Sequence, residues 1–149
     1  MKASEGQAGR IFVLRLEDGD VVPHCIEQFA AEKKIALAQV ILLGGLADGQ
    51  IVVGPRHSNE LPPDPMVLPV DAAHEVVAVG ILATGPDGKP NLHIHGALGR
   101  SGQTVTGCLR MGVKTWLIGE AVIIEIAGAR AARAKDPVSG FALLEPGIC

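Results

Sequence analysis

The stretch LHIHGALGRSGQTVTGCLRMG, residues 92–112, constrains the fold of this chain more than any other part of its sequence. Side chains alternate between apolar and polar on both sides of Ser101-Gly102, a pair that is typical of a two-residue turn. Such a turn fixes the pairing of the two strands by counting outward, and it places His95 opposite Cys108. A shift by one residue would mix the apolar and polar sets, so their clean separation supports this register.

The predicted hairpin therefore has one apolar face and one polar face. Directly opposed Cβ atoms lie about 4.5–5.5 Å apart, and every second residue along a strand lies about 6.5–7 Å away. The side chains of His93, His95 and Cys108 can thus converge on one metal ion, and three protein ligands with one open position are typical of a zinc site that holds water or substrate. An ordinary pair of surface histidines is the alternative. The apolar face carries Ile94, Leu98, Val105 and Leu109, and the polar face carries His93, His95, Ala97, Thr106, Cys108 and Arg110.

The rest of the chain has the pattern of further strands with short connections and one helix. Alternating or continuous apolar residues predict strands in RIFVLRLEDGD, AHEVVAVGILAT and TWLIGEAVIIEI, and two strands in ALAQVILLGGLADGQIVVG separated at its glycines. VVPHCIEQFAAEKKI is spaced as a helix, with Ile26, Phe29 and Ala30 inward and Asp20 as the candidate N-cap. Residues 55–69 hold half of the prolines and predict a long irregular loop.

Strands this close together leave no room for βαβ crossovers, so we predict an α+β domain with a mostly antiparallel sheet and one main helix. A chain of 149 residues suits one domain. We expect residues 1–9 to be a disordered lead, 10–145 the domain and 146–149 a tail. Near the C-terminus, ARAARAKDPVSGFALLEP predicts a short strand pair, with Arg133 on a solvated strand edge.

Composition narrows the classes of partner. Hydrophobic residues make up 48% of the chain and aromatic residues only 3%, which favours a β-rich domain that buries surface between subunits. A net charge of -3 implies no general attraction to nucleic acid or anionic membrane, and no apolar run reaches the roughly 18 residues of a membrane span. There is no signal-peptide pattern, and three cysteines without disulfide spacing indicate free thiols in the cytoplasm.

At the hairpin the chain resembles the PPC domain (plants and prokaryotes conserved), which is attached to AT-hook proteins in plants and stands alone in bacteria and archaea. The mark of the family is a strand H-L-H, a turn, and then G-G-H-L. Here these motifs stand as LHIH at 92–95 and TGCL at 106–109. RIFVLRLEDGD, ILLGGLADGQI, HEVVAVGIL and GEAVIIE match in the family's order, so the resemblance extends from about residue 10 to 144.

The resemblance implies a homotrimer, and in some prokaryotic members a metal, taken as zinc, on the three motif histidines. Carried over, the ligands are His93, His95 and Cys108, and Cys108 departs from the usual histidine. A thiolate is a good zinc ligand, and its negative charge would leave the ion less Lewis-acidic than three histidines would. The family is commonly labelled DNA-binding, but this chain has no AT-hook core and no other nucleic-acid motif.

A more distant resemblance, at the level of the fold, is to acetolactate decarboxylase, which holds zinc through an H-x-H pair and a later histidine. It implies an alternative to a metal-binding module of unknown ligand, namely a zinc-dependent lyase or hydrolase acting on a small carboxylate. Glu75 would then be the acid/base and Arg110 the anion holder. Glu75 is expected to be buried, because its strand is apolar on both sides, and a structural ion pair with Arg10 or Arg110 is the other explanation for it.

Overall fold

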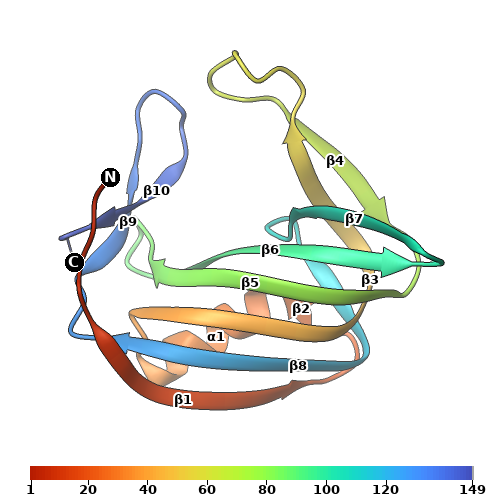
Figure 1. Ribbon diagram of the computed structural model, residues 1–149, viewed down its shortest axis with the longest axis horizontal. Coiled ribbons are helices and arrows are strands. Elements are labelled where there is room, and N and C mark those ends of the chain that lie inside the picture. Colours follow the sequence, from red (N-terminus) through yellow and green to blue (C-terminus); the bar gives the residue numbers. More distant parts are fainter. Residues whose placement is uncertain (149) are drawn as a thin grey trace.

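The structure of the protein, a computed structural model, describes residues 1–148. Within these residues ten strands form one sheet, with the helix α1 behind it (Figure 1), and this confirms the predicted antiparallel α+β fold. No helix in this part of the chain has the length and apolar character needed to cross a membrane. The elements are β1 (Gln7–Leu16), β2 (Val21–Val22), α1 (His24–Lys33), β3 (Leu37–Pro55), β4 (Pro65–Val70), β5 (His74–Thr84), β6 (Pro90–Arg100), β7 (Gln103–Cys108), β8 (Val113–Ala127), β9 (Ala131–Lys135) and β10 (Ala142–Pro146).

The sheet is built around β3, which is 19 residues long. Its first half lies between β5 and β8, and its second half continues past two register shifts to pair with β4. Gly44 lies at the first shift with a φ of +129°, where a Cβ would stand 2.3 Å from the carbonyl oxygen of Ile118. The predicted break into two strands is therefore wrong, because the glycines form bulges inside one strand instead of a turn.

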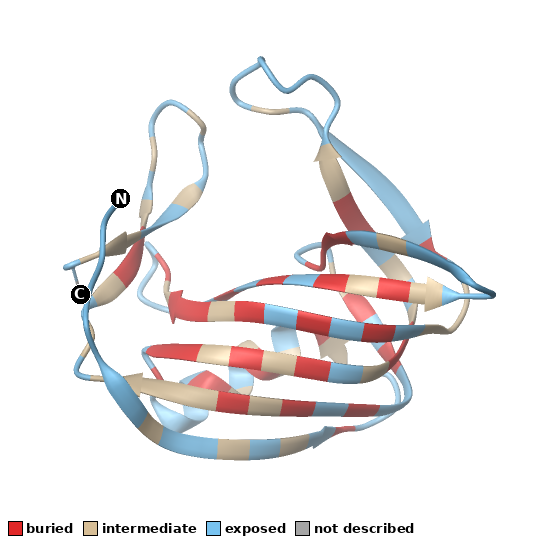
Figure 2. Ribbon diagram, viewed as in Figure 1, coloured by how far each residue is buried: buried red, intermediate tan, exposed pale blue. Residues whose placement is uncertain are grey.

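The β6–β7 hairpin has the predicted register. Ser101 and Gly102 have φ angles of +52° and +77°, as a two-residue turn of this kind requires. From this turn the pairing runs without a slip to His95 opposite Cys108. Buried and exposed residues consequently alternate along β6 and along its neighbour β5 (Figure 2).

The core lies between the sheet and α1 and consists almost entirely of aliphatic side chains. Ile26 and Ala30 are completely buried on the inner face of the helix, and Phe29 packs against them from the edge, as the helical spacing predicts. The low aromatic content is therefore compatible with a dense core. From the sheet, the core includes Leu16, Val40, Leu42, Val76, Ala78, Leu82, Ile94, Leu98, Ala121 and Ile123.

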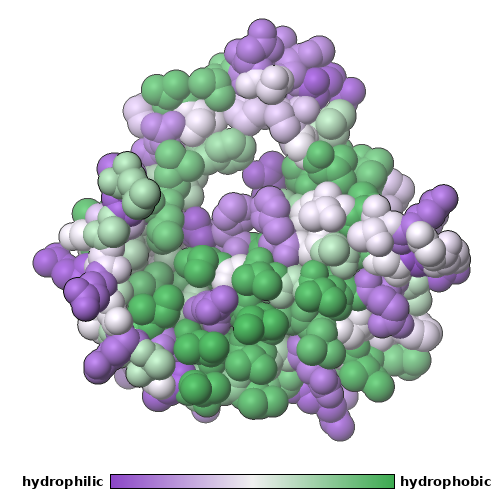
Figure 3. All heavy atoms as spheres, in the orientation of Figure 1, coloured by the Kyte–Doolittle hydropathy of each residue, from purple (hydrophilic) through white to green (hydrophobic). Residues whose placement is uncertain are grey.

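The opposite side of the sheet is also apolar, but it is exposed. Val13 is 81% exposed and Val77 is 66% exposed, and strand pairing places Leu43 directly beside Val77. We call Ile11, Val13, Leu43, Val77 and Val79 the apolar sheet face; Figure 3 shows apolar atoms gathered over this part of the molecule. Exposed apolar patches of this kind are typical of interaction surfaces.

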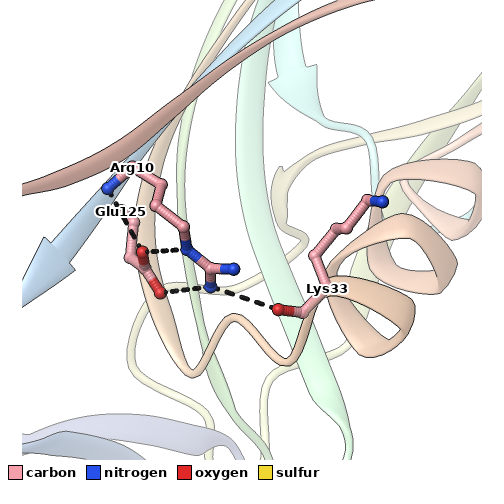
Figure 4. A network of polar contacts seen from close by, with 3 residues as sticks. All are labelled: Arg10, Lys33 and Glu125. Carbon is pink, nitrogen blue, oxygen red and sulfur yellow. Dashed lines mark hydrogen bonds and ion pairs between the residues drawn. The ribbon is translucent and has the colours of Figure 1, made fainter.

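Arg10 connects β1, β8 and the end of α1 (Figure 4). Its guanidinium donates hydrogen bonds of 2.7 and 2.8 Å to the carboxylate of Glu125 on β8, and one of 3.1 Å to the carbonyl oxygen of Lys33. A cation at this position complements the dipole at the C-terminal end of the helix. The hydrogen bond from Arg10 also holds the pKa of Glu125 below its usual value.

Local boundaries differ from those predicted in three places. β1 begins at Gln7, inside the expected lead, because Gln7 pairs with Ala127. Pro23 is at the N-cap of α1, and the carboxylate of Asp20 instead accepts a hydrogen bond of 2.8 Å from the backbone N–H of Glu17. The proline-rich loop is shorter than expected, since β4 forms its last part. The predicted C-terminal strand pair is present as β9 and β10.

Candidate metal centre

His93, His95 and Cys108 come together on one face of the β6–β7 hairpin. Cys108 is buried, with 6% of its surface exposed, whereas the two histidines are exposed. The ligand atoms all lie within 4.8 Å of one another, and the Nε2 atoms of His93 and His95 are 3.0 Å apart. The structure therefore brings together the three side chains that the sequence placed on one face; that they hold an ion stays a prediction.

The spacing and chemistry of these donors fit zinc. Zinc binds nitrogen at about 2.0–2.1 Å and sulfur at about 2.3 Å, so ligand atoms on one tetrahedral ion lie roughly 3.3–3.8 Å apart. The Nε2–Nε2 distance of 3.0 Å and the upper limit of 4.8 Å for the cluster lie on either side of this range. The cluster contains no carboxylate among the described residues, which disfavours calcium and magnesium.

The surroundings of His93 favour its metal-binding form. Partial burial lowers the pKa of His93, and the nearby charges of His95, Arg133 and Arg110 lower it further. A neutral imidazole is the form that coordinates metal ions. Protons therefore compete less with a metal ion for the imidazole of His93.

The cluster opens into a cavity of about 560 Å³, within the usual size range of small-molecule sites. Its walls come from β6, from the end of β3 with the proline-rich segment after it, and from the β9–β10 hairpin. Phe141, Leu143 and Leu144 line the hairpin side, and Pro63 and Pro65 line the other. Figure 3 shows the molecule hollowed between these two projections. The cluster is thus accessible to a ligand of moderate size.

Arg110 and Arg133 line the same cavity. Arg110 follows directly after β7, and its guanidinium carbon lies 5.5 Å from the centre of the Phe141 ring, a cation–π distance. The sequence predicted Arg110 beside His93; strand pairing ends at Cys108, and the structure shows that both residues line the cavity.

Arg133 is buried, with 6% of its surface exposed, so its expected place on a solvated edge is wrong. Its guanidinium donates to the carbonyl oxygens of Ile81 at 2.9 Å and of Asn91 and Ala142 at 3.4 Å. The residue before it, Ala132, pairs with the end of β5. This long-range contact covers Arg133 with neighbouring strands.

Glu75 does not reach this site. It is exposed and lies opposite Gly99, four residues along β6 from His95, which corresponds to roughly 13 Å. It is also not among the residues that line the cavity. The expectation of a buried carboxylate is wrong, because Glu75 lies on the exposed side of β5, and Arg10 pairs with Glu125 instead.

The fold and the cluster together define a class of protein: a small, mostly antiparallel α+β domain with histidine and cysteine ligands on a hairpin beside a cavity. The family model of the Plants and Prokaryotes Conserved (PCC) domain matches residues 3–127. The chain belongs to this family, which confirms the resemblance seen in the hairpin motifs.

Solved structures share the fold over nearly the whole chain. A metal-containing protein from Archaeoglobus fulgidus is 26% identical, with a TM-score of 0.82 over 96% of this chain and 98% of that one. A PPC protein from Pyrococcus horikoshii is 22% identical, with a TM-score of 0.83 over 97% of each chain. A protein from Ralstonia eutropha, provisionally described as DNA-binding, is 22% identical, with a TM-score of 0.70 over 89% and 88%. No curated protein matches the chain.

Proposed function

We propose that the protein binds a transition metal, zinc in the first place, through His93, His95 and Cys108, and that it holds a small ligand in the adjoining cavity. The observation that carries this proposal is the convergence of the three donors within 4.8 Å at the cavity. The metal-containing protein of Archaeoglobus fulgidus, with the same fold, supports it. Cys25 and Cys108 are free thiols, which supports a reducing, cytoplasmic location.

Each part of the site would have a separate role. His93, His95 and Cys108 would hold the ion and leave one side of it facing the cavity. When bound, zinc with an open coordination position supplies Lewis acidity. Arg110 and Arg133 both line the cavity, and their positive charges would attract an anionic group of the ligand.

The test is metal analysis of protein purified without a nickel step. We expect close to one zinc per chain in the wild type, and a large loss of metal in His93→Ala and His95→Ala, because each removes a ligand. His57→Ala, in the exposed proline-rich loop, is the matched control and should keep its metal. Wild-type protein without stoichiometric metal under non-chelating conditions would remove the site.

We also propose that the apolar sheet face is covered by further copies of the chain in a homotrimer, as the family implies. The five side chains of this face are all at least half exposed in the single chain. His95 lies opposite Val79 on the same side of the sheet, so the metal centre would border the subunit contact. Closed symmetric assemblies are the usual means of covering such a surface.

The alternative function, a zinc-dependent lyase or hydrolase, is supported by the cavity but not by the position of Glu75. The cavity is open to a small acid, as that reaction requires, and Arg110 lines it, which supports a role as anion holder. Glu75 is not in place as the acid/base. An enzyme of this kind would need another proton donor at the site.

DNA binding is the second candidate function, and it rests on two similar structures that are provisionally described as DNA-binding. The net charge of -3 gives it no general electrostatic support. Retardation of duplex DNA that weakens steeply with salt would favour it. Absence of binding at low salt would end it.

A further inference from the structure

We propose that the ligand of the cavity is an amphipathic monocarboxylate. Its carboxylate lies between Arg110 and Arg133 beside the metal cluster, and its apolar chain lies along the β9–β10 hairpin and the proline-rich segment. This assignment rests on the proposed metal-binding site and adds the class of ligand that the site selects.

Arg133 is a buried cation that makes no ion pair within residues 1–148. A guanidinium has five N–H groups, and the three carbonyl oxygens around Arg133 account for three of them. Glu27 is near enough to favour the charged form of Arg133, but its Oε1 atom accepts the backbone N–H of Leu92 at 2.8 Å. Burial lowers the pKa of Arg133, as expected for a cation that lacks a close anion. A ligand carboxylate would supply that charge.

Arg110 provides the second positive group. None of the ion pairs within residues 1–148 involves Arg110 or Arg133. Both line the same cavity as His93, His95 and Cys108. Phe141 holds the Arg110 guanidinium from one side. Two guanidinium groups at one end of a site suit a planar carboxylate, which accepts paired hydrogen bonds.

The remaining surface of the cavity is apolar. The side chains of Phe141, Leu143 and Leu144 are between 36% and 43% exposed. Phe141 is one of only three phenylalanines in the chain, and it lies at the cavity and not in the core. Pro63 and Pro65 face them from the other wall. Within residues 1–148 no acidic side chain lines the cavity, which disfavours cationic ligands. A volume of about 560 Å³ is far larger than a carboxylate alone needs, so the ligand has an apolar body as well.

The experiment is calorimetric titration of the zinc-loaded protein with butanoate, hexanoate and octanoate, and with octanol and octylamine as uncharged and cationic controls. Affinity should rise about fourfold per added methylene, from burial of apolar surface. Octanol and octylamine should bind at least about tenfold more weakly than octanoate, because they lose the charge-assisted hydrogen bonds.

Variants separate the charge from the fold. Arg110→Met and Arg133→Met should each lower octanoate affinity at least about tenfold. Arg100→Met should not, because Arg100 is exposed and donates to the Ala73 carbonyl oxygen away from the cavity. Arg133 is buried, so Arg133→Met can unfold the protein. The Arg110 side chain is exposed, so Arg110→Met should fold normally and tests the assignment by itself.

Equal affinity for octanol and octanoate, or unchanged octanoate binding in Arg110→Met, would overturn the assignment. Zinc content is measured on the same samples. Full zinc without octanoate binding overturns the ligand class and leaves the metal site standing. Octanoate binding to protein that takes up no zinc supports the carboxylate site at Arg110 and Arg133 and overturns the metal proposal. Protein that binds neither zinc nor octanoate overturns both proposals.

Discussion

Cys108 decides what kind of metal site the hairpin can form. Its thiol is buried, whereas the two imidazoles beside it are exposed. A thiolate is softer and more negative than an imidazole, so it favours zinc and cobalt and lowers the Lewis acidity of the ion. This single side chain therefore separates the site from a three-histidine centre.

Cobalt-loaded protein tests this role. Wild-type protein should show a thiolate-to-cobalt charge-transfer band, and Cys108→Ser should lose it together with at least about tenfold in metal affinity, because a charged ligand is replaced by a neutral hydroxyl. Cys108→His should keep the metal without the band. Cys25→Ser is the control, since burial raises the pKa of Cys25 to about 11 and it lies on α1 outside the cluster. A band that survives Cys108→Ser would show that this thiol is not a ligand.

At the scale of elements, β3 depends on glycine at its bulge. Gly44→Ala would put a Cβ against the backbone at a φ of +129°, so we expect destabilisation of about 3 kcal/mol or more in urea unfolding. Gly19→Ala is the control, because Gly19 also has a positive φ, +88°, but open space around it, and it should lose only about 1 kcal/mol. Similar losses at both positions would mean that β3 does not form the bulge described.

The Arg10–Glu125 contact between β1 and β8 should appear in the acid stability of the protein. The pKa of Glu125 is lowered in the folded state, chiefly by the hydrogen bond from Arg10. Its stabilising effect is thus complete above the unfolded value of about 4.3 and is lost as the pH falls through the lower folded value. Glu125→Gln should remove this part of the pH dependence, measured by thermal melts from neutral pH to pH 2. Glu60→Gln, in an exposed loop, should melt like the wild type at every pH.

The sequence predicted correctly those features of the fold that depend on neighbouring residues. The hairpin register followed from Ser101-Gly102 and from strict alternation, because both are set by neighbouring residues. The bulge in β3 did not follow, because a glycine in a bulge looks the same in sequence as a glycine in a turn. Glu75 was misplaced because β5 is apolar on both sides in sequence, and one of these sides, with Val77 and Val79, is exposed in the structure.

The walls of the cavity could not be predicted from the sequence, for a different reason. Arg133 becomes buried only because β9 packs beside the end of β5, almost fifty residues earlier in the chain, and no local pattern encodes that contact. The alternation of RAARAK gave no sign of it. The three cluster residues could be named from sequence, whereas the pocket around them required the fold.

For the whole molecule, the apolar sheet face should control assembly. Wild-type protein is expected to sediment as a trimer, and Val77→Lys to dissociate without unfolding, because a charge would be buried at the contact. Val138→Lys is the control: Val138 is 64% exposed but lies in the β9–β10 connection, away from this face. A monomeric wild type, or equal dissociation by both substitutions, would contradict the proposed contact.

The central claim is that His93, His95 and Cys108 share one ion. X-ray absorption at the zinc edge of the zinc-loaded protein tests it most directly. We predict nitrogen scatterers at about 2.0–2.1 Å and a single sulfur at about 2.3 Å, with the sulfur absent from Cys108→Ser. A zinc shell of nitrogen and oxygen alone in the wild type would contradict it.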